Sequence, residues 1–178
     1  QYNLGKAEGN EFVDDGFQHI RYNYQTNDWL AWEAFTQLQY NQLIKLKMRW
    51  LLGTGPRFRL YKKSKSQFYL GTLYMFVYNE ESTEEDGQTV FLRDHRLSTY
   101  ISFRLKPTEQ ILFSGTTYIQ PVLNDFSDLR VSTQTSMLFK ISSTLQFTTH
   151  FRLVYDSDVP EGVLNTIYQL TNGLRWNF

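Results

Sequence analysis

One stretch decides the fold: IKLKMRWLLGTGPRFRL, residues Ile44–Leu60. Alternate positions starting from Ile44 are mainly apolar, whereas the positions between them are mainly cationic or glycine, with Leu51 as the one misfit. A period of two is typical of a β-strand that has one apolar and one polar face. The alternation continues well beyond the ~5 or 6 residues of a common soluble strand, so it predicts an unusually long strand.

The same alternation recurs along the chain and predicts nine full strands. They are expected at Phe12–Gln25, Trp29–Asn41, Ile44–Tyr61, Gln67–Asn79, Leu92–Leu105, Glu109–Gln120, Phe126–Ile141, Leu145–Tyr155 and Thr166–Phe178. The segment Tyr2–Lys6 can be the end of a tenth strand, truncated at its start. A bacterial barrel has an even number of strands and leaves no sheet edge in lipid, so ten to twelve strands are expected.

Composition sets the broad class. The chain of 178 residues fits one domain, residues 1–178, and its 18 basic side chains balance 18 acidic ones, which gives no electrostatic reason to expect a nucleic-acid partner. Without cysteine, no disulfide or thiolate metal site is possible. No run approaches the ~20 apolar residues of a membrane-spanning helix, which excludes a helical membrane protein.

Alternation alone fits a soluble sandwich as well as a membrane barrel, because each has one apolar and one polar face per strand. Strand length, aromatic content of 17% and the tail favour a transmembrane antiparallel up-and-down β-barrel. Such a barrel carries aromatic girdles at both membrane interfaces. The candidates for these girdles are Trp29, Trp32, Trp50, Tyr61, Tyr100, Tyr155 and Trp176.

The lengths of the connections predict which end of the barrel faces the periplasm and which faces outward. Those at Thr26–Asp28, Lys62–Ser66, Lys106–Thr108 and Ser142–Thr144 are short, whereas Glu80–Phe91 and Asp156–Asn165 are long. Outer-membrane barrels have short periplasmic turns and longer outer loops. The chain is therefore expected in a Gram-negative-type outer membrane, with its C-terminus on the periplasmic side.

The polar faces predict a charged lumen. Its expected lining is Arg21, Glu33, Lys45, Lys47, Arg49, Arg57, Arg59, Asp94, Arg96, Arg104, Asp128, Arg130, His150 and Arg152. These charges either form a selectivity lining or a salt-bridged plug, and the plug is favoured because side chains fill small barrels. A turn centred on Asn27 would place Arg21 opposite Glu33. A turn centred on Ser143 would place His150 opposite Ser136 and Arg152 opposite Gln134.

The C-terminal strand predicts an assembly signal. Leu174, Trp176 and Phe178 share one face, and the chain stops at Phe178. This pattern resembles the C-terminal signature of outer-membrane barrels, which end on an aromatic residue that the barrel-assembly machinery reads.

Two longer segments carry a family resemblance. They are YDSDVPEGV, residues Tyr155–Val163, and LTNGLRWNF, residues Leu170–Phe178, with a fainter likeness in LGTGPRFRL, residues Leu52–Leu60. Together they resemble the salt-stress-induced outer-membrane protein family, and the likeness covers most of the chain from about Gly9 onward. The resemblance implies a barrel of unknown function in the outer membrane and supplies no catalytic residues.

Other constellations favour plain interpretations. His150 beside Ser136, with Asp128 or Asp94, could suggest a hydrolase, but nothing in the sequence fixes triad geometry, so a polar interior histidine is preferred. His19, His95 and His150 lack metal-ligand spacing, and no metal or other cofactor is expected. Acidic residues crowd the longest loop and could bind calcium or bridge to lipopolysaccharide, but a solvated loop is preferred; they are Glu80, Glu81, Glu84, Glu85 and Asp86. Gly53 and Gly55 could relieve crowding inside the barrel, and a bulge would reconcile Pro56 with a strand.

Three function classes remain open from the sequence. The favoured one is a passive structural or narrow-pore barrel in envelope integrity or osmotic response, and the next is a subunit or docking partner of a larger envelope assembly. An enzyme acting on envelope lipids ranks third. The expected partners are outer-membrane lipid and lipopolysaccharide, the barrel-assembly machinery and other envelope proteins.

Overall fold

The computed structural model describes residues 2–7, 10–42, 45–82, 89–159 and 162–176, with side chains described from Asp15 onward. The described chain forms one sheet of ten strands. They are β1 (Tyr2–Ala7), β2 (Asn10–Gln25), β3 (Leu30–Asn41), β4 (Leu46–Lys63), β5 (Ser66–Ser82), β6 (Thr89–Leu105), β7 (Ile111–Val122), β8 (Asp125–Lys140), β9 (Leu145–Asp156) and β10 (Thr166–Trp176).

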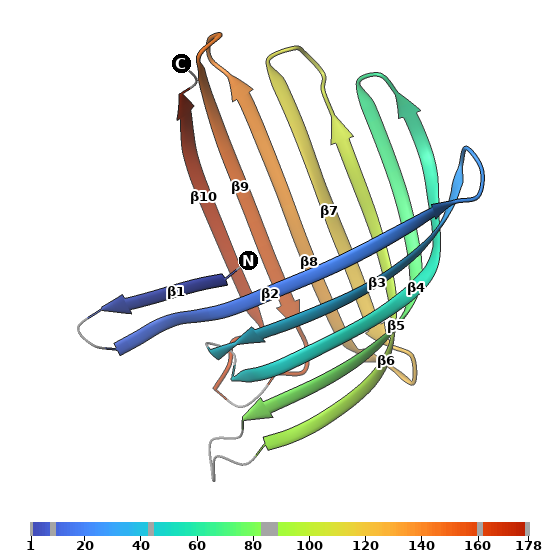
Figure 1. Cartoon of the computed structure of the whole chain (residues 1–178), viewed down its shortest axis with the longest axis vertical. Helices are drawn as coiled ribbons and strands as arrows, with labels where there is room; N and C mark the ends of the chain where they lie inside the picture. Colours follow the sequence, from blue (N-terminus) through green and yellow to red (C-terminus); the bar gives the residue numbers. More distant parts are fainter. Residues whose placement is uncertain (1, 8–9, 43–44, 83–88, 160–161, 177–178) are drawn as a thin grey trace.

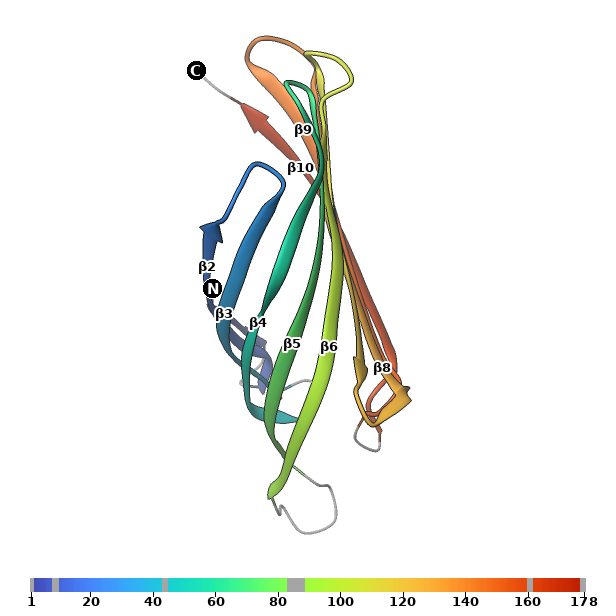
Figure 2. The same ribbon diagram turned by 90° about the vertical axis from the view of Figure 1, so that its right-hand side faces the viewer.

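The strands pair in chain order, each antiparallel to the next, so the topology is up-and-down as predicted. The sheet curls strongly, and β1 to β4 cross in front of β7 to β10 in Figure 1; the side view in Figure 2 shows the two walls. Among the described residues no ladder joins β1 to β10. No helical segment in the described ranges has the length and apolar character needed to cross a bilayer.

All nine predicted full strands are confirmed, and Tyr2–Ala7 adds the tenth. The largest boundary error lies in the β5–β6 hairpin, whose ladder runs to the pair Ser82–Thr89. The predicted connection Glu80–Phe91 is thereby reduced to residues 83–88, which include most of its acidic residues and lie outside the described part. Phe178, the predicted last residue of β10, also lies outside it.

The two ends of the sheet differ in their connections. The turns that follow β2, β4, β6 and β8 lie at one end together with the end of β10, here called the short-turn end (Figure 1). The opposite end, the long-loop end, holds the connection between β9 and β10, residues 157–165, and also the two-residue connection between β7 and β8. The predicted grouping of four short connections at one end is confirmed.

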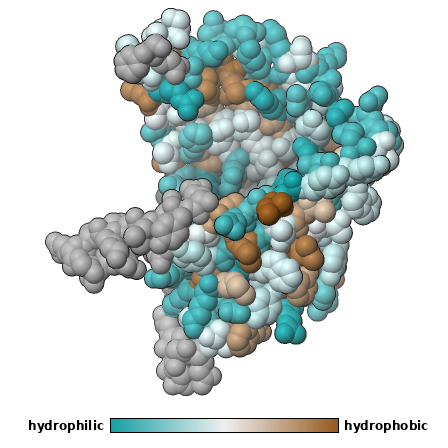
Figure 3. Space-filling model, viewed as in Figure 1, coloured by the Kyte–Doolittle hydropathy of each residue, from teal (hydrophilic) through white to brown (hydrophobic). Residues whose placement is uncertain are grey.

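The outer face of the sheet is apolar and aromatic. Large apolar side chains are exposed on it from most strands, among them Ile20, Leu38, Leu52, Ile101, Ile119, Leu170 and Leu174. Figure 3 shows brown hydrophobic side chains and pale ones of intermediate hydropathy over the front strands, and hydrophilic ones gathered at the upper turns. A soluble protein rarely exposes so continuous an apolar surface, whereas a lipid-facing wall requires one.

Two outer-face tryptophans have their indole N–H groups satisfied by threonines of a neighbouring strand. Trp32 Nε1 donates to Thr54 Oγ1 at 2.8 Å, and Trp50 Nε1 donates to Thr36 Oγ1 at 2.9 Å. The threonines stand in otherwise apolar rows, where a bare indole N–H would lack a partner in lipid. The prediction that Tyr100 belongs to an aromatic girdle is wrong. Tyr100 lies on the inner face of β6 with Ser98 and is only 2% exposed. The other six predicted girdle residues are exposed.

The inner face holds a compact apolar cluster. It consists of Phe35, Leu51, Leu73, Met75, Val77 and Tyr100, with Tyr118 packed against it. Leu51, the misfit in the cationic row of β4, belongs to this cluster. The apolar run at Tyr69–Tyr78 is explained in the same way, because the middle of β5 is apolar on both faces.

Glycines on the inner face make room for aromatic rings on the next strand. Gly53 lies directly opposite Phe35, and Gly71 lies opposite Tyr100. A Cβ added at either glycine would overlap the facing ring. The prediction that Gly53 relieves crowding inside the barrel is therefore confirmed. The bulge expected at Pro56 is wrong: the β4–β5 register is the same on both sides of it, and the irregularities lie at Leu46/Met48 and Arg59/Tyr61.

Candidate functional site

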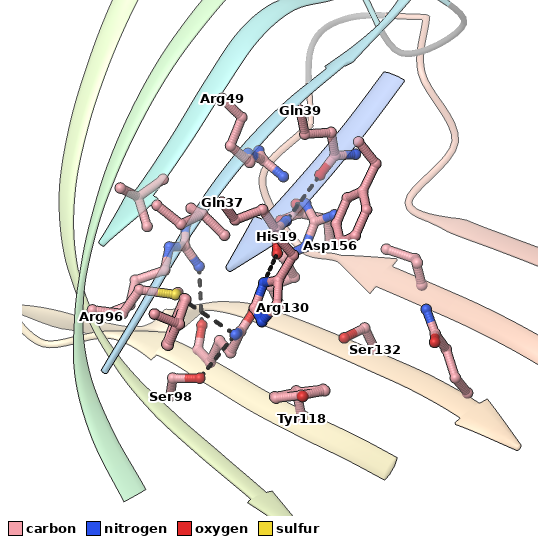
Figure 4. A pocket seen from close by; sticks show the side chains of 18 of the residues that line it. His19, Gln37, Gln39, Arg49, Arg96, Ser98, Tyr118, Arg130, Ser132 and Asp156 are labelled. Atoms are coloured by element: carbon pink, nitrogen blue, oxygen red, sulfur yellow. Dashed lines mark hydrogen bonds and ion pairs between the residues drawn. The ribbon is translucent and has the colours of Figure 1, made fainter. Parts of the chain in front are cut away.

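The lumen-facing side of the sheet is the candidate site. Strand alternation places most of the predicted lining on this inner face, where side chains from β2 to β9 converge (Figure 4). The members that the register and cavity positions place there are Arg21, Glu33, Arg49, Arg57, Arg59, Asp94, Arg96, Arg104, Asp128, Arg130, His150 and Arg152.

Two predicted lining residues do not belong to the inner row. Lys45 lies in the β3–β4 connection with a φ of 55°. Lys47 lies at the β4–β5 irregularity, is exposed, and its Nζ contacts Thr89 Oγ1 at 2.7 Å. The bulge breaks the alternation that the sequence pattern assumed, so the neighbouring Leu46, expected on the lipid side, is instead 2% exposed opposite Glu81.

A crossbar of four side chains spans the middle of the lumen: Arg21, Glu33, Tyr100 and Tyr118. The Tyr100 hydroxyl donates to Glu33 Oε2 at 2.7 Å, and Arg21 Nη2 donates to the Tyr118 hydroxyl oxygen at 3.0 Å. Arg21 Nη1 lies 3.6 Å from Glu33 Oε1, and its guanidinium sits over the Tyr100 ring. These contacts link β2 and β3 to β6 and β7, so the crossbar ties opposite walls together.

The register around the crossbar differs from the prediction. Arg21 faces Phe35, and Asn23 faces Glu33, so the predicted Arg21–Glu33 pairing is wrong by two residues. In the tight turn the backbone amides of Thr26 and Asn27 both donate to the Leu30 carbonyl. The centre of the turn therefore lies beyond Asn27. Arg21 reaches Glu33 diagonally instead. The predicted pairs His150–Ser136 and Arg152–Gln134 are confirmed.

Toward the long-loop end, arginines pair with carboxylates along the wall. Arg96 Nη2 lies 2.9 Å from Asp128 Oδ1 and 3.4 Å from Asp94 Oδ2. Arg130 Nη1 lies 2.6 Å from Asp156 Oδ2. Arg49 donates from Nε to Asn79 Oδ1 at 2.8 Å, and its Nη2 is 4.0 Å from Glu81. Buried charges need such partners, since an unpaired one is costly.

The YDSD segment quoted for the family resemblance fixes the long-loop end of β9. Asp156 binds Arg130, and the next residue, Ser157, ties back to β8: its amide donates to the Leu129 carbonyl, and the Leu129 amide donates to Ser157 Oγ at 2.7 Å. Asn165 Nδ2 donates to the Asp156 carbonyl at 3.0 Å across the loop. The segment therefore holds the end of β9 against β8 at the mouth of the lumen.

Two cavities lie on the inner face of the sheet. The long-loop cavity, about 250 Å³, is lined by side chains of β2 to β9, including His19, Arg49 and Arg130. The short-turn cavity, about 740 Å³, is lined by β6 to β10, including Arg104, Ser136 and His150. Tyr118, Gln134 and Arg152 line both.

The residues of the hydrolase alternative are not brought together. Ser136 and His150 are cross-strand neighbours toward the short-turn end, where Ser136 Oγ bonds with Ser114 Oγ at 2.9 Å. Asp94 and Asp128 both engage Arg96 toward the long-loop end. Asp128 and Ser136 are eight residues apart on one strand, roughly 26 Å at the usual rise per residue. Among the described residues, no group of three or more histidines and carboxylates could hold a metal ion.

Two parts of the site were not predicted from the sequence. The apolar cluster was signalled by Leu51 and by the apolar run Leu73–Tyr78 of β5, which does not alternate between apolar and polar residues. Tyr118 carried no signal, because its role depends on its facing Arg21 from a strand 97 residues away in the chain.

The apolar outer wall, up-and-down topology and polar lumen define a porin-like outer-membrane β-barrel. A solved structure with this fold is described as "NanC porin structure in rhombohedral crystal form"; it is 10% identical, has a TM-score of 0.55, and the match covers 93% of this chain and 80% of that one. A family model described as "Protein of unknown function, DUF481" matches residues 1–178, so the chain belongs to that family. No curated protein matches the sequence.

Proposed function

We propose that this protein is a passive barrel of the outer membrane that is occluded or narrowly conducting and supports envelope integrity during osmotic or salt stress. The observation that carries this proposal is the crossbar. Glu33 and Tyr100, 0% and 2% exposed, are held with Arg21 and Tyr118 in one bonded network across the lumen. Side chains bonded across a lumen brace its walls and fill its interior. Such a network is therefore better suited to an occluded barrel than to a wide aqueous channel.

The salt-stress part of the proposal has a separate support. The segments Tyr155–Val163 and Leu170–Phe178 resemble the salt-stress-induced outer-membrane proteins, and the first of them anchors the lumen mouth through Asp156 and Ser157. A strain lacking the protein should survive a shift to high salt less well than its parent, and the intact gene should restore survival. Equal survival of both strains would remove this part of the proposal.

The proposed orientation places the short-turn end and the C-terminus in the periplasm. Short turns on that side and longer loops outside are the rule for outer-membrane barrels. The partners in this arrangement are membrane lipid, lipopolysaccharide around the outer rim and the barrel-assembly machinery during insertion. Protease cleavage within residues 83–88 in intact cells, with the short turns protected, is the result expected; the reverse pattern would invert the orientation.

Single-channel recording in a planar bilayer tests the occluded lumen. The wild type should give little or no steady current, and Tyr118→Ser should raise it, because this change removes a ring of the crossbar while leaving Arg21 beside Glu33. Tyr168→Ser on the exposed outer face of β10 is the matched control and should change nothing. A large wild-type current that Tyr118→Ser leaves unchanged would contradict the proposal. Combined Arg49, Arg57 and Arg59 to Ala changes then tell whether that row sets the ion preference of any current.

A further inference from the structure

The arginines at the two ends of the lumen differ in how their charge is balanced. Toward the long-loop end they pair with carboxylates. The lining of the short-turn cavity, by contrast, holds Arg104, His150 and Arg152 but no aspartate or glutamate. Within the described ranges no ion pair joins a carboxylate to any of these three side chains. The two arginines therefore give this cavity a positive charge that the protein itself does not neutralise.

The strand register joins these side chains in two adjacent rows that run across the wall. The first row runs from β6 to β9 and consists of Arg104, Ser114, Ser136 and His150. The second row runs from β6 to β10 and consists of Ser102, Thr116, Gln134, Arg152 and Gln169. Three interstrand spacings separate β6 from β9, roughly 14 Å. Arg104 and Arg152 thus stand on opposite sides of a floor of hydroxyl and amide groups.

The hydroxyl groups of this floor are held in place and keep donors to spare. Thr116 Oγ1 donates to Ser102 Oγ at 3.0 Å, so the Ser102 proton can bond elsewhere. Ser114 Oγ and Ser136 Oγ lie 2.9 Å apart, and the bond between two hydroxyls uses only one of their two protons. Both rows therefore offer O–H donors between the guanidinium groups.

The cavity presents accessible polar groups and little apolar surface. Arg104, His150 and Arg152 are all exposed, unlike the buried arginines at the long-loop end. In Figure 1 the short-turn half of β7 to β10 rises above the crossing strands β1 and β2. Phe103, although it borders the cavity, alternates with the lining row and packs its ring on Phe68 and Phe113. A hydrophilic solute suits such a lining.

We propose that the short-turn cavity binds a small, multiply charged oxyanion of the diphosphate class. Guanidinium groups form strong charge-assisted hydrogen bonds to phosphoryl oxygens, and the hydroxyls supply further donors. Two linked phosphoryl groups suit a floor this wide, because one can meet Arg104 while the other meets Arg152. The cavity, about 740 Å³, has room for such an anion. Because the lining offers little apolar surface, the ligand is a soluble anion rather than a lipid.

Sodium pyrophosphate is the test ligand, titrated calorimetrically into the folded full-length chain in an uncharged detergent. One pyrophosphate should bind saturably per chain, since the protein offers one such floor. Phosphate and sulfate should bind more weakly, and acetate and glucose should give no saturable heat. Equal affinities for pyrophosphate and acetate would mean a general charge effect, and that result, like the absence of saturation with pyrophosphate, would refute the site.

Two substitutions that remove the same charge separate the site from general electrostatics. Arg152→Gln should weaken pyrophosphate binding about tenfold, as expected for loss of a charge-assisted contact. Arg93→Gln is the matched control, because Arg93 is exposed, lies over the Tyr78 ring and does not line the short-turn cavity. Equal losses of affinity in the two variants would contradict the assignment.

Gln134→Glu supplies the carboxylate that the cavity lacks. Gln134 faces Arg152 across the β8–β9 ladder, so the new side chain should pair with that arginine and weaken pyrophosphate binding at least as much as Arg152→Gln does. The variant keeps every arginine, so it tests the site even where Arg152→Gln does not fold. Unchanged affinity for pyrophosphate in folded Gln134→Glu protein would overturn the proposal.

The binding measurement stands apart from the conductance measurement. Calorimetry on protein in micelles records binding without any current. A wide conducting lumen would therefore refute the occluded barrel and leave pyrophosphate binding intact, whereas failure of pyrophosphate to bind would refute the anion site alone.

Discussion

The Tyr100 hydroxyl of β6 donates to the Glu33 carboxylate of β3 at 2.7 Å, although 67 residues separate them in the chain. Both side chains are buried, and Glu33 Oε1 has no hydrogen-bond partner within the described part of the chain. The Tyr100 hydroxyl is therefore an important hydrogen-bond donor to the buried Glu33 carboxylate. The arrangement makes Glu33 sensitive to loss of the Tyr100 hydroxyl.

Tyr100→Phe should destabilise the folded barrel by about 1–3 kcal/mol, because it leaves a buried charged acceptor short of a donor. Urea unfolding in lipid vesicles measures the change. Tyr168→Phe, on the exposed face of β10, is the control and should have a free energy of unfolding close to that of the wild type. Comparable losses for both variants would show that the Glu33 bond is not special.

Gly53→Ala should cost about 1–3 kcal/mol, since the added methyl overlaps the Phe35 ring. Adding Phe35→Leu should recover part of the loss, and the coupling energy from the double-mutant cycle measures how much. Gly173→Ala is the milder comparison, because its Cβ would lie 3.1 Å from the Thr148 hydroxyl oxygen. A purely additive cycle would argue against the glycine–ring pairing.

Thr54→Val should lower stability by about 1 kcal/mol, because the Trp32 indole N–H loses its acceptor on the lipid-facing wall. Thr135→Val on the outer face of β8 is the control, since no side-chain hydrogen bond of Thr135 occurs among the described residues. Unfolding in vesicles followed by tryptophan emission reports both variants. A stabilising effect at position 54 would mean that the indole finds another acceptor.

Deletion of Phe178 should impair insertion more than neutralising Glu84, Glu85 and Asp86 does. The expectation rests on the resemblance of Leu174, Trp176 and Phe178 to the assembly signature of outer-membrane barrels. Gel migration of unboiled and boiled protein from membrane fractions measures the folded share, since a folded barrel migrates differently. Equal folded shares of the two variants would count against the tail as a signal.

The sequence predicts the wall of this protein far better than its interior. Period-two alternation is a local property, so the strands, their two faces and the short turns follow from it. Local rules fail where the ladder is irregular, as at Leu46 and Lys47, because a bulge reverses the facing of one residue without leaving a mark in hydropathy. They also placed Tyr100 on the lipid side, since an aromatic ring suits either face.

The site itself was only half accessible to prediction. The residue types of the lining are visible as a polar row, and twelve of the fourteen predicted lining residues stand on the inner face. Which of them meet is set by the curl of the sheet, and no short-range pattern encodes the approach of Arg21 to Tyr118.

The glycine–ring pairs at Gly53–Phe35 and Gly71–Tyr100 also constrain how such a wall can change over generations. The two positions of such a pair are coupled, because a side chain at the glycine position overlaps the facing ring unless the ring is replaced as well. Related chains should therefore keep both the glycine and the aromatic residue or replace both. In some chains the two residue types should be exchanged between the two strands. Joint inheritance of this kind would allow strand order to be inferred from sequences alone.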